Sequence, residues 1–185
     1  MSYDLAFSIK VFSALFAIMN PVANVPVFLS LTSGASDAER RRVAVTALIA
    51  VSIGCVVAAV AGSSILAMFG VSIDDFRLAG GLLVLLIALS MLHGSANNQQ
   101  APTDKERKDL DSADSVAIYP LAIPLLLGPG TIATMIVLGH SAINSGKELA
   151  FTAGLAAFLL LLAASMLSAP FIGHYLSPKV TAITQ

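Results

Sequence analysis

The stretch VAVTALIAVSIGCVVAAVAGSSILAMF, residues 43–69, contains no charged side chain and indicates the fold class. The hydrocarbon core of a bilayer is about 30 Å thick, and a helix needs about 20 mainly apolar residues to cross it. A helix also satisfies its own backbone hydrogen bonds, for which lipid offers no partners. Residues 43–69 therefore predict a transmembrane helix.

The composition of the whole chain points the same way. Of its 185 residues, 57% are hydrophobic and 11% are charged, and the mean hydropathy is +0.87. A soluble domain carries roughly a quarter charged residues, so this chain has too few to cover a water-facing surface. The net charge is −1 and no basic stripe is present, so we expect no nucleic-acid partner. The expected main partner is the lipid bilayer.

Other apolar stretches reach or approach the same length. The run Leu82–Leu86 lacks the alternation of polar and apolar residues that a membrane β-barrel requires. We therefore predict an all-α, polytopic transmembrane bundle, with residues 1–185 forming a single transmembrane domain. The predicted spans are Leu5–Leu31, Val43–Phe69, Phe76–Leu92, Val116–Leu138 and Leu149–Phe171.

The basic residues of the connections predict the orientation. The first connection, Thr32–Arg42, contains three arginines, and the third, Gly94–Ser115, contains Lys105, Arg107 and Lys108. The second, Gly70–Asp75, has no basic residue, and the fourth, Gly139–Glu148, has only Lys147. Because cytoplasmic loops carry the excess of lysine and arginine, the first and third connections are expected in the cytoplasm. The N-terminus is then outside.

Two of the spans contain prolines near their centres. The first has Asn20-Pro21-Val22-Ala23-Asn24-Val25-Pro26, and the fourth has Pro120, Pro124 and Gly128-Pro129-Gly130-Thr131. Asparagine is a favoured helix N-cap, and proline is favoured at the position after it. Asn20-Pro21, and more weakly Gly128-Pro129, therefore predict new helix starts in mid-membrane.

The two proline motifs also suggest an inverted repeat. Placing Pro21 opposite Pro129 gives an offset of 129 − 21 = 108, and the second span then falls on the fifth. With three helices in each repeat the halves are inverted, a plan common in secondary transporters. We expect repeat one at about 1–93, a cytoplasmic loop at about 94–115, and repeat two at about 116–185. A sixth helix would begin at residue 184, so we expect repeat two to be incomplete in this chain.

Half-helix starts at mid-membrane are candidates for a solute site. Each presents free N–H groups and a partial positive charge, which suit an anionic group such as a carboxylate. The candidate binding residues are Asn20, Pro21, Asn24, Pro26, Gly128, Pro129, Gly130 and Thr131. The alternative is that both motifs are ordinary kinks, because membrane helices tolerate proline and their polar side chains can bond neighbouring helices.

Other site classes find no support in the sequence. No metal-ligand cluster, phosphate-binding loop or nucleophile–base pair is present, so we expect no enzyme, no catalytic residue, no bound metal and no cofactor. No aspartate or glutamate lies deep in a span, which disfavours a proton-driven exporter of cations. A neutral or zwitterionic solute fits better, with Na⁺ or H⁺ as the candidate coupling ion.

At these motifs the chain resembles the MarC family of bacterial and archaeal inner-membrane proteins. The resemblance rests on residues 20–29, on Phe76-Arg77-Leu78-Ala79-Gly80-Gly81, and on Pro120–Pro124 with Gly128-Pro129-Gly130. It covers essentially the whole chain and implies six spans and an inner-membrane location. It also implies likeness to small neutral amino acid transporters, because some members carry glycine or alanine. The chain departs from the pattern by ending before the sixth helix.

The function predicted from these observations is secondary transport of a small neutral solute, such as an amino acid. Two alternatives remain open at this point: a passive channel, and a non-transporting membrane protein that acts as a scaffold or regulator. A homo-oligomer is compatible with the sequence.

Overall fold

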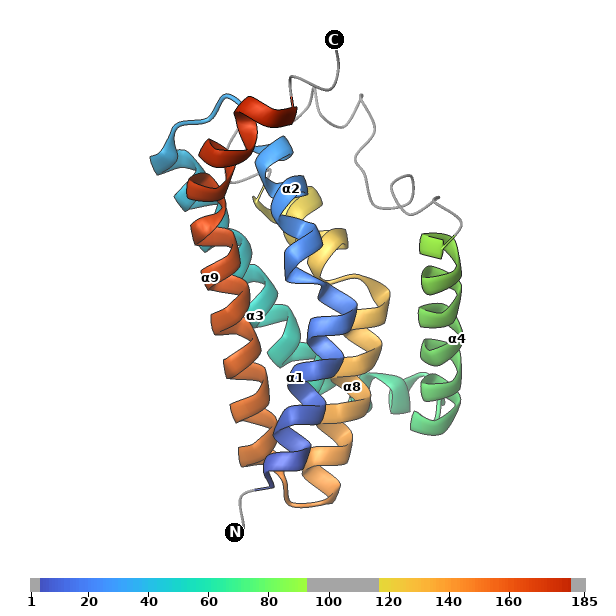
Figure 1. Cartoon of the computed structure of the whole chain (residues 1–185). Coiled ribbons are helices and arrows are strands. Elements are labelled where there is room, and N and C mark those ends of the chain that lie inside the picture. The colour runs from blue at the N-terminus through green and yellow to red at the C-terminus, as the bar shows by residue number, and fades with distance from the viewer. Residues whose placement is uncertain (1–3, 93–116, 181–185) are drawn as a thin grey trace.

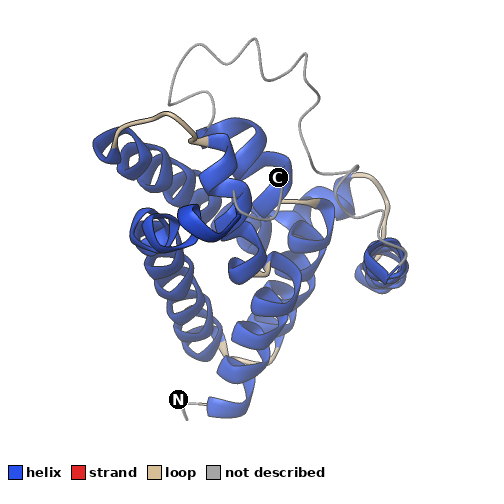
Figure 2. Cartoon of the chain, turned by 45° about the horizontal axis from the view of Figure 1, so that its top comes forward, coloured by secondary structure: helices blue, strands red, loops and turns tan. Residues whose placement is uncertain are grey.

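A computed structural model of the chain describes residues 4–92 and 117–180 (Figure 1). All secondary structure in this part is helical, and Figure 2 shows helices joined by short loops. The elements are α1 (Leu5–Met19), α2 (Pro21–Leu31), α3 (Asp37–Met68), α4 (Ile73–Leu92), η1 (Ala117–Leu126), α8 (Pro129–Asn144) and α9 (Glu148–Val180). The all-α prediction is confirmed for these residues.

Each predicted span corresponds to a helix or to a pair of helices. Two helical stretches, Asp37–Met68 and Glu148–Ala169, are each long and apolar enough to cross a membrane. Helices α1 and α2 meet the same test as a pair bent by 40°, which makes them one broken span. The other two predicted spans correspond to α4 and to η1 with α8. They do not meet this test over the described residues, so their crossing stays a prediction.

The helix ends differ from the predicted boundaries at α3, α4, α8 and α9, and α9 continues past Phe171 to Val180. Helix α3 begins at Asp37, so the arginines at 40–42 lie on its first turns and not in a loop. The cause is a capping box, in which the Ser36 side chain accepts from the Glu39 amide and the Glu39 carboxylate accepts from the Ser36 amide at 2.8 Å. Similarly, α4 begins at Ile73, and α8 continues past Gly139 to Asn144.

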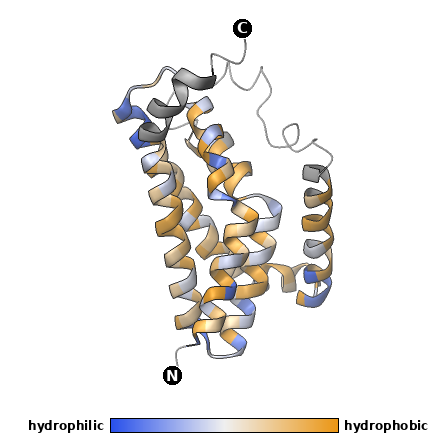
Figure 3. Ribbon diagram, in the orientation of Figure 1, coloured by the Kyte–Doolittle hydropathy of each residue, from blue (hydrophilic) through white to orange (hydrophobic). Residues whose placement is uncertain are grey.

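The spans alternate in direction through the bundle (Figure 1). The start of α1, the α3–α4 connection and the α8–α9 connection lie at one end, and the α2–α3 connection lies at the other. Hydrophilic colour gathers near these ends, while the helices between them are mostly apolar (Figure 3). This distribution is the one expected of a chain that crosses a bilayer several times.

The helices pack in a reciprocal pattern. Helix α3 packs mainly on α8 and η1, and α9 packs mainly on α1 and α2. Each broken span is therefore supported by a continuous helix from the other half of the sequence. Helix α4 stands beside the bundle and contacts mainly α8 (Figures 1 and 2).

Small residues make the closest contacts between helices. A Cβ atom added to Gly139 of α8 would lie 2.6 Å from the carbonyl oxygen of Ala59 on α3. One added to Gly154 of α9 would lie 2.5 Å from the carbonyl oxygen of Ser8 on α1. The Ser8 hydroxyl also donates to the Ala150 carbonyl at 2.8 Å, a buried hydrogen bond between α1 and α9. Association through small residues and hydrogen bonds is typical of membrane helices.

Candidate functional site

The break between α1 and α2 is centred on Asn20. Its backbone has φ 38° and ψ 72°, and among the described residues it is the one non-glycine with a positive φ. Asparagine tolerates this left-handed conformation better than most residues. The Asn20 side-chain oxygen accepts from the Ala23 amide at 3.2 Å, and Pro21 occupies the first helical position. The predicted helix start is therefore present, with Asn20 as its cap.

Asn24 lies one turn into α2 and donates a hydrogen bond to a carbonyl at the break. Its side chain is buried, and its Nδ2 donates to the carbonyl of Met19, the last residue of α1. In lipid such a carbonyl needs a partner, because proline and the left-handed turn have interrupted the helical ladder. The Asn24 Oδ1 accepts no hydrogen bond from the described part of the chain.

The second break lies between η1 and α8. Gly128 is extended, with φ −63° and ψ 167°, and Pro129 is the first residue of α8. Gly128 has no side chain to cap the helix, which agrees with its weaker sequence signal. Thr131 is buried and its hydroxyl donates to the Leu126 carbonyl at 2.9 Å. Thr131 thus has the role here that Asn24 has in the first break.

Segment η1 is irregular for a reason that its sequence contains. Tyr119 (φ −128°, ψ 125°) and Ile123 (φ −129°, ψ 121°) are extended, and each precedes a proline. A proline ring clashes with a helical residue before it and moves that residue into the extended region. The helix predicted over 116–138 is therefore wrong at Tyr119 and Ile123, which precede prolines, whereas the break predicted at Gly128-Pro129 is present.

The two breaks lie at the same level of the bundle. A Cβ atom added to Gly130 would lie 3.5 Å from Cγ2 of Ile18, which belongs to the last turn of α1. From this level α2 and α8 run to opposite ends of the molecule (Figure 1). The N-terminal end of α8, with its partial positive charge, therefore lies against the last turn of α1, close to where α2 begins.

An apolar pocket of about 480 Å³ lies beside the second break, between α4 on one side and η1 and α8 on the other. It is lined by Phe76, Ala79, Gly80, Leu83, Ile123, Leu127, Pro129, Ile132 and Ala133. Pro129 belongs both to this lining and to the start of α8. The pocket could hold the apolar part of a ligand whose polar part contacts the break.

The predicted site residues divide into two groups. Most of them gather at the two breaks: Asn20, Pro21, Asn24, Gly128, Pro129, Gly130 and Thr131. Pro26 is different. It lies inside α2 without interrupting it, on an exposed face that also carries Val22 and Ser30. Nothing in the described part of the chain connects Pro26 with the breaks.

Sequence reasoning missed Ile18 of α1 and Val84 of α4, both of which contact the start of α8 at Gly130. It also missed the α4 side of the pocket. Ordinary apolar residues in apolar helices carry no local signal of such a role, and only their packing reveals it.

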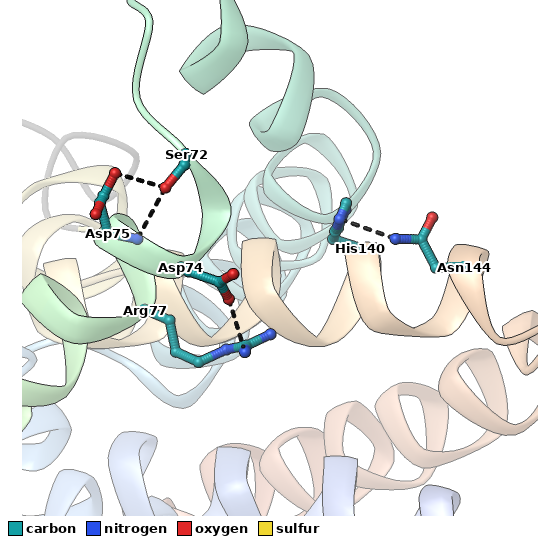
Figure 4. Close-up of polar contacts among 6 residues, drawn as sticks. All are labelled: Ser72, Asp74, Asp75, Arg77, His140 and Asn144. Carbon is teal, nitrogen blue, oxygen red and sulfur yellow. Dashed lines mark hydrogen bonds and ion pairs between the residues drawn. The ribbon is translucent and has the colours of Figure 1, made fainter.

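The charged residues of the described chain lie away from both breaks. Its carboxylates belong to Asp4, Asp37, Glu39, Asp74, Asp75 and Glu148, each at the start of a helix. Figure 4 shows the contacts near the start of α4, where Arg77 pairs with Asp74 at 3.0 Å and Ser72 bonds Asp75. On α8, Asn144 bonds His140 at 2.9 Å. No group of three histidine, cysteine or acidic residues in the described chain could hold a metal ion.

These features define the class of protein: a multi-pass helical membrane protein with interrupted spans. The profile of the family described as "MarC family integral membrane protein" matches residues 5–184. The chain belongs to this family, as the resemblance at its proline motifs predicted.

Relatives with the same general name occur in bacteria and archaea. The chain is 37% identical to the UPF0056 membrane protein YhcE of Escherichia coli over 158 residues, covering 85% of this chain and 73% of that protein. It is 37% identical to YvbG of Bacillus subtilis over 158 residues, covering 84% and 74%. It is 39% identical to MJ1677 of Methanocaldococcus jannaschii over 148 residues, covering 78% and 70%.

Some relatives are covered less completely. The matched part spans 62% of the UPF0056 protein BU267 of Buchnera aphidicola, at 39% identity over 135 residues and 73% of this chain. No solved structure matches the chain. The names of these relatives describe a membrane protein and state no substrate.

Proposed function

We propose that this chain transports a small neutral solute, such as an amino acid, across the cytoplasmic membrane of a bacterium or archaeon. The solute would bind between the break at Asn20-Pro21 and the break at Gly128-Pro129. The proposal assigns the chain no catalytic step, no cofactor and no bound metal.

The observation that carries this proposal is the approach of the α8 start to the last turn of α1, just before α2 begins. Gly130 at the start of α8 approaches Ile18 at the end of α1, and α2 begins just beyond Ile18. Unpaired N–H groups at helix starts bind carboxylates without a basic side chain. The Asn24 Oδ1 is an acceptor beside them, suited to an ammonium group. A zwitterion would thus find both kinds of partner.

The charge distribution favours a neutral solute over a cation. A cationic substrate in a membrane site needs an acidic partner, and the described carboxylates lie at helix starts away from the breaks. Backbone carbonyls freed at a helix break coordinate Na⁺ in transporters of this general plan. Sodium is therefore the coupling ion we would test first, with H⁺ as the alternative.

The reciprocal packing supports an inverted repeat as the basis of transport. Helix α3 supports the broken span of the second half, and α9 supports that of the first. A pseudo-two-fold axis in the membrane plane would exchange these pairs. The sixth helix of such a repeat would begin at residue 184, outside the described residues, and stays a prediction.

Uptake of labelled alanine and glycine into proteoliposomes tests the proposal. The protein would be reconstituted as this full chain, with a sodium or a proton gradient imposed. Saturable uptake that follows the gradient supports a carrier. Equilibration without accumulation indicates the passive channel, and absence of flux with either gradient indicates the scaffold or regulator.

Two variants locate the site. Asn20→Gly keeps the left-handed backbone and removes the side chain, and Asn24→Ala removes the Oδ1 acceptor together with the hydrogen bond to the Met19 carbonyl. Because a hydrogen bond to a charged group contributes about 1.5–3 kcal/mol, kcat/KM should fall about 10- to 150-fold in Asn24→Ala. Asn144→Ala is the matched control, since Asn144 is exposed at the end of α8. Equal uptake by all three variants would refute a site at the first break.

A further inference from the structure

The described helices divide into two units whose tight contacts are internal. The α9 unit comprises α1, α2 and α9, and the α3 unit comprises α3, α4, η1 and α8. Within the α9 unit, Gly154 rests on the Ser8 backbone and Ser8 bonds Ala150. The rings of Phe12 and Phe158 also meet edge to face, with centroids 6.2 Å apart.

An ion pair joins the starts of α1 and α9 within the α9 unit. Lys147, just before α9, pairs with Asp4, just before α1, at 2.8 Å. Its ammonium group also lies 5.6 Å from the centre of the Phe7 ring. The first and last spans are thus joined by backbone contact, hydrogen bond, ring contact and ion pair.

The α3 unit is held by glycines. Gly139 of α8 rests on the Ala59 backbone of α3, and a Cβ atom added to Gly62 would overlap the Ile136 side chain. Helix α4 is docked in the same way, because a Cβ added to Gly80 would lie 2.9 Å from the Cβ of Ala133. Such contacts leave little freedom for the helices to move against one another.

Contacts between the two units are of another kind. Helix α9 touches α3 and α8, and α1 touches α8. In the described chain, the one glycine that faces across this boundary is Gly130, which would meet Ile18 at 3.5 Å, an ordinary van der Waals distance. The ion pairs and ring contacts given for described residues do not cross it, and one side-chain hydrogen bond does, from Arg40 Nε of α3 to the Thr32 carbonyl at the end of α2 at 3.3 Å. The boundary passes between the two helix breaks.

The chain passes between the units at two connections, and each contains a glycine with positive φ. Gly34 (φ 83°) lies between α2 and α3, and Gly146 (φ 60°) lies between α8 and α9. Neither would meet any atom within 4 Å if a Cβ were added. The two connections lie at opposite ends of the bundle (Figure 1). Unconfined glycines at element ends are suited to absorb the backbone change of a hinge.

We propose that the α9 unit and the α3 unit move as two rigid bodies about hinges at Gly34 and Gly146. This motion opens the space between the helix breaks first to one end of the molecule and then to the other. The inference rests on the proposed function for its purpose, since a carrier must expose its site alternately. The packing supports the proposed direction of motion, because the close contacts within each unit stay intact when the two units move.

Distances between spin labels test the motion directly. Cysteine pairs for labelling would be placed in the full-length chain with Cys55→Ala, reconstituted in lipid vesicles. One pair spans the units at one end, at Ser30 and Ile118, and another spans them at the other end, at Leu5 and Ala67. We expect two populations for each pair, with one distance lengthening as the other shortens when alanine and sodium are added.

Pairs within a unit serve as controls. Leu5 with Thr152 lies in the α9 unit, and Ala38 with Ile118 lies in the α3 unit. Both control distances should stay single and unchanged. Single inter-unit distances that ignore alanine and sodium, or control distances that change equally, would overturn the inference.

Alanine substitutions at the hinges provide a second test. Gly34→Ala and Gly146→Ala should change the ratio of the two populations about 5-fold or more, because left-handed backbone is costly for a residue with a Cβ. Gly70→Ala is the matched control, since Gly70 has φ 69° and open surroundings but joins α3 to α4 inside one unit. An equal effect of Gly70→Ala would count against the hinges.

The label distances do not depend on transport. Two populations in a protein that moves no solute would leave the hinge inference standing and remove the proposed function. Uptake by a protein whose inter-unit distances stay single would support the proposed function and overturn the hinge inference.

Discussion

The contact between Gly139 of α8 and Ala59 of α3 provides a sharp test of the packing. A Cβ atom at residue 139 would lie 2.6 Å from the Ala59 carbonyl oxygen and 2.9 Å from its Cα. Carbon atoms prefer separations of about 3.5–4.0 Å, so Gly139→Ala requires α8 to retreat by roughly 0.5–1 Å. Backbone atoms on both sides prevent a cheaper rearrangement of side chains.

The retreat also weakens neighbouring contacts. Ile136 of α8 packs against Gly62 of α3, and a gap of about 0.5–1 Å forfeits about a quarter to a half of each dispersion contact. Overpacking in a close-packed interior typically costs about 1–3 kcal/mol. The folding equilibrium constant should therefore fall between about 5- and 150-fold.

Unfolding by titration of sodium dodecyl sulfate into detergent micelles, followed by circular dichroism, measures this loss. Gly81→Ala is the matched control, because Gly81 is also helical but has open space where a Cβ would be. The control should be neutral or slightly stabilising, since alanine favours helix more than glycine does. If Gly139→Ala is as harmless as Gly81→Ala, the close approach of α3 and α8 is wrong.

Three further perturbations test other parts of the fold. Ser8→Ala should cost about 0.6–1.7 kcal/mol in the same titration, the range for hydrogen bonds between membrane helices, whereas the exposed Ser13→Ala should cost little. Thr131→Val leaves a buried carbonyl unpaired and should cost about 1–3 kcal/mol, while Thr131→Ser should retain most of the stability. Lys147 lowers the pKa of Asp4. The ion pair therefore stabilises the fold at pH values above the ordinary pKa of aspartate. This stabilisation is lost as the pH falls through the lowered pKa of Asp4. Asp4→Asn should remove that decline in an acid titration, and an unchanged pH profile would contradict the pairing.

Local chemistry made several features predictable from the sequence. Apolar runs identified the spans, and Asn20-Pro21 identified the start of α2, because capping and the proline ring act on adjacent residues. The extended residues Tyr119 and Ile123 carried an equally local signal in the prolines that follow them. The sequence analysis predicted the break at Gly128-Pro129 but predicted no extended residue before Pro120 or Pro124.

Other features depend on contacts between distant segments. Pro21 and Pro26 are both in the first broken span, yet only the first lies at the break, because Asn20 adopts the left-handed turn there. The approach of Gly154 to Ser8 and the apolar pocket beside α4 arise from packing of helices far apart in sequence. No pattern within either helix predicts such a partner.

The support of the first broken span by α9 has a consequence for biogenesis. Helices α1 and α2 emerge first from the ribosome, and their main partner, α9, emerges last among the described helices. Until α9 is inserted, the bent span lacks its main neighbour and has the smaller contact of α1 with α8, although membrane helices depend on neighbours where prolines free their carbonyls. Among the described helices, the pair that enters the membrane first is therefore among the last to gain its main partner.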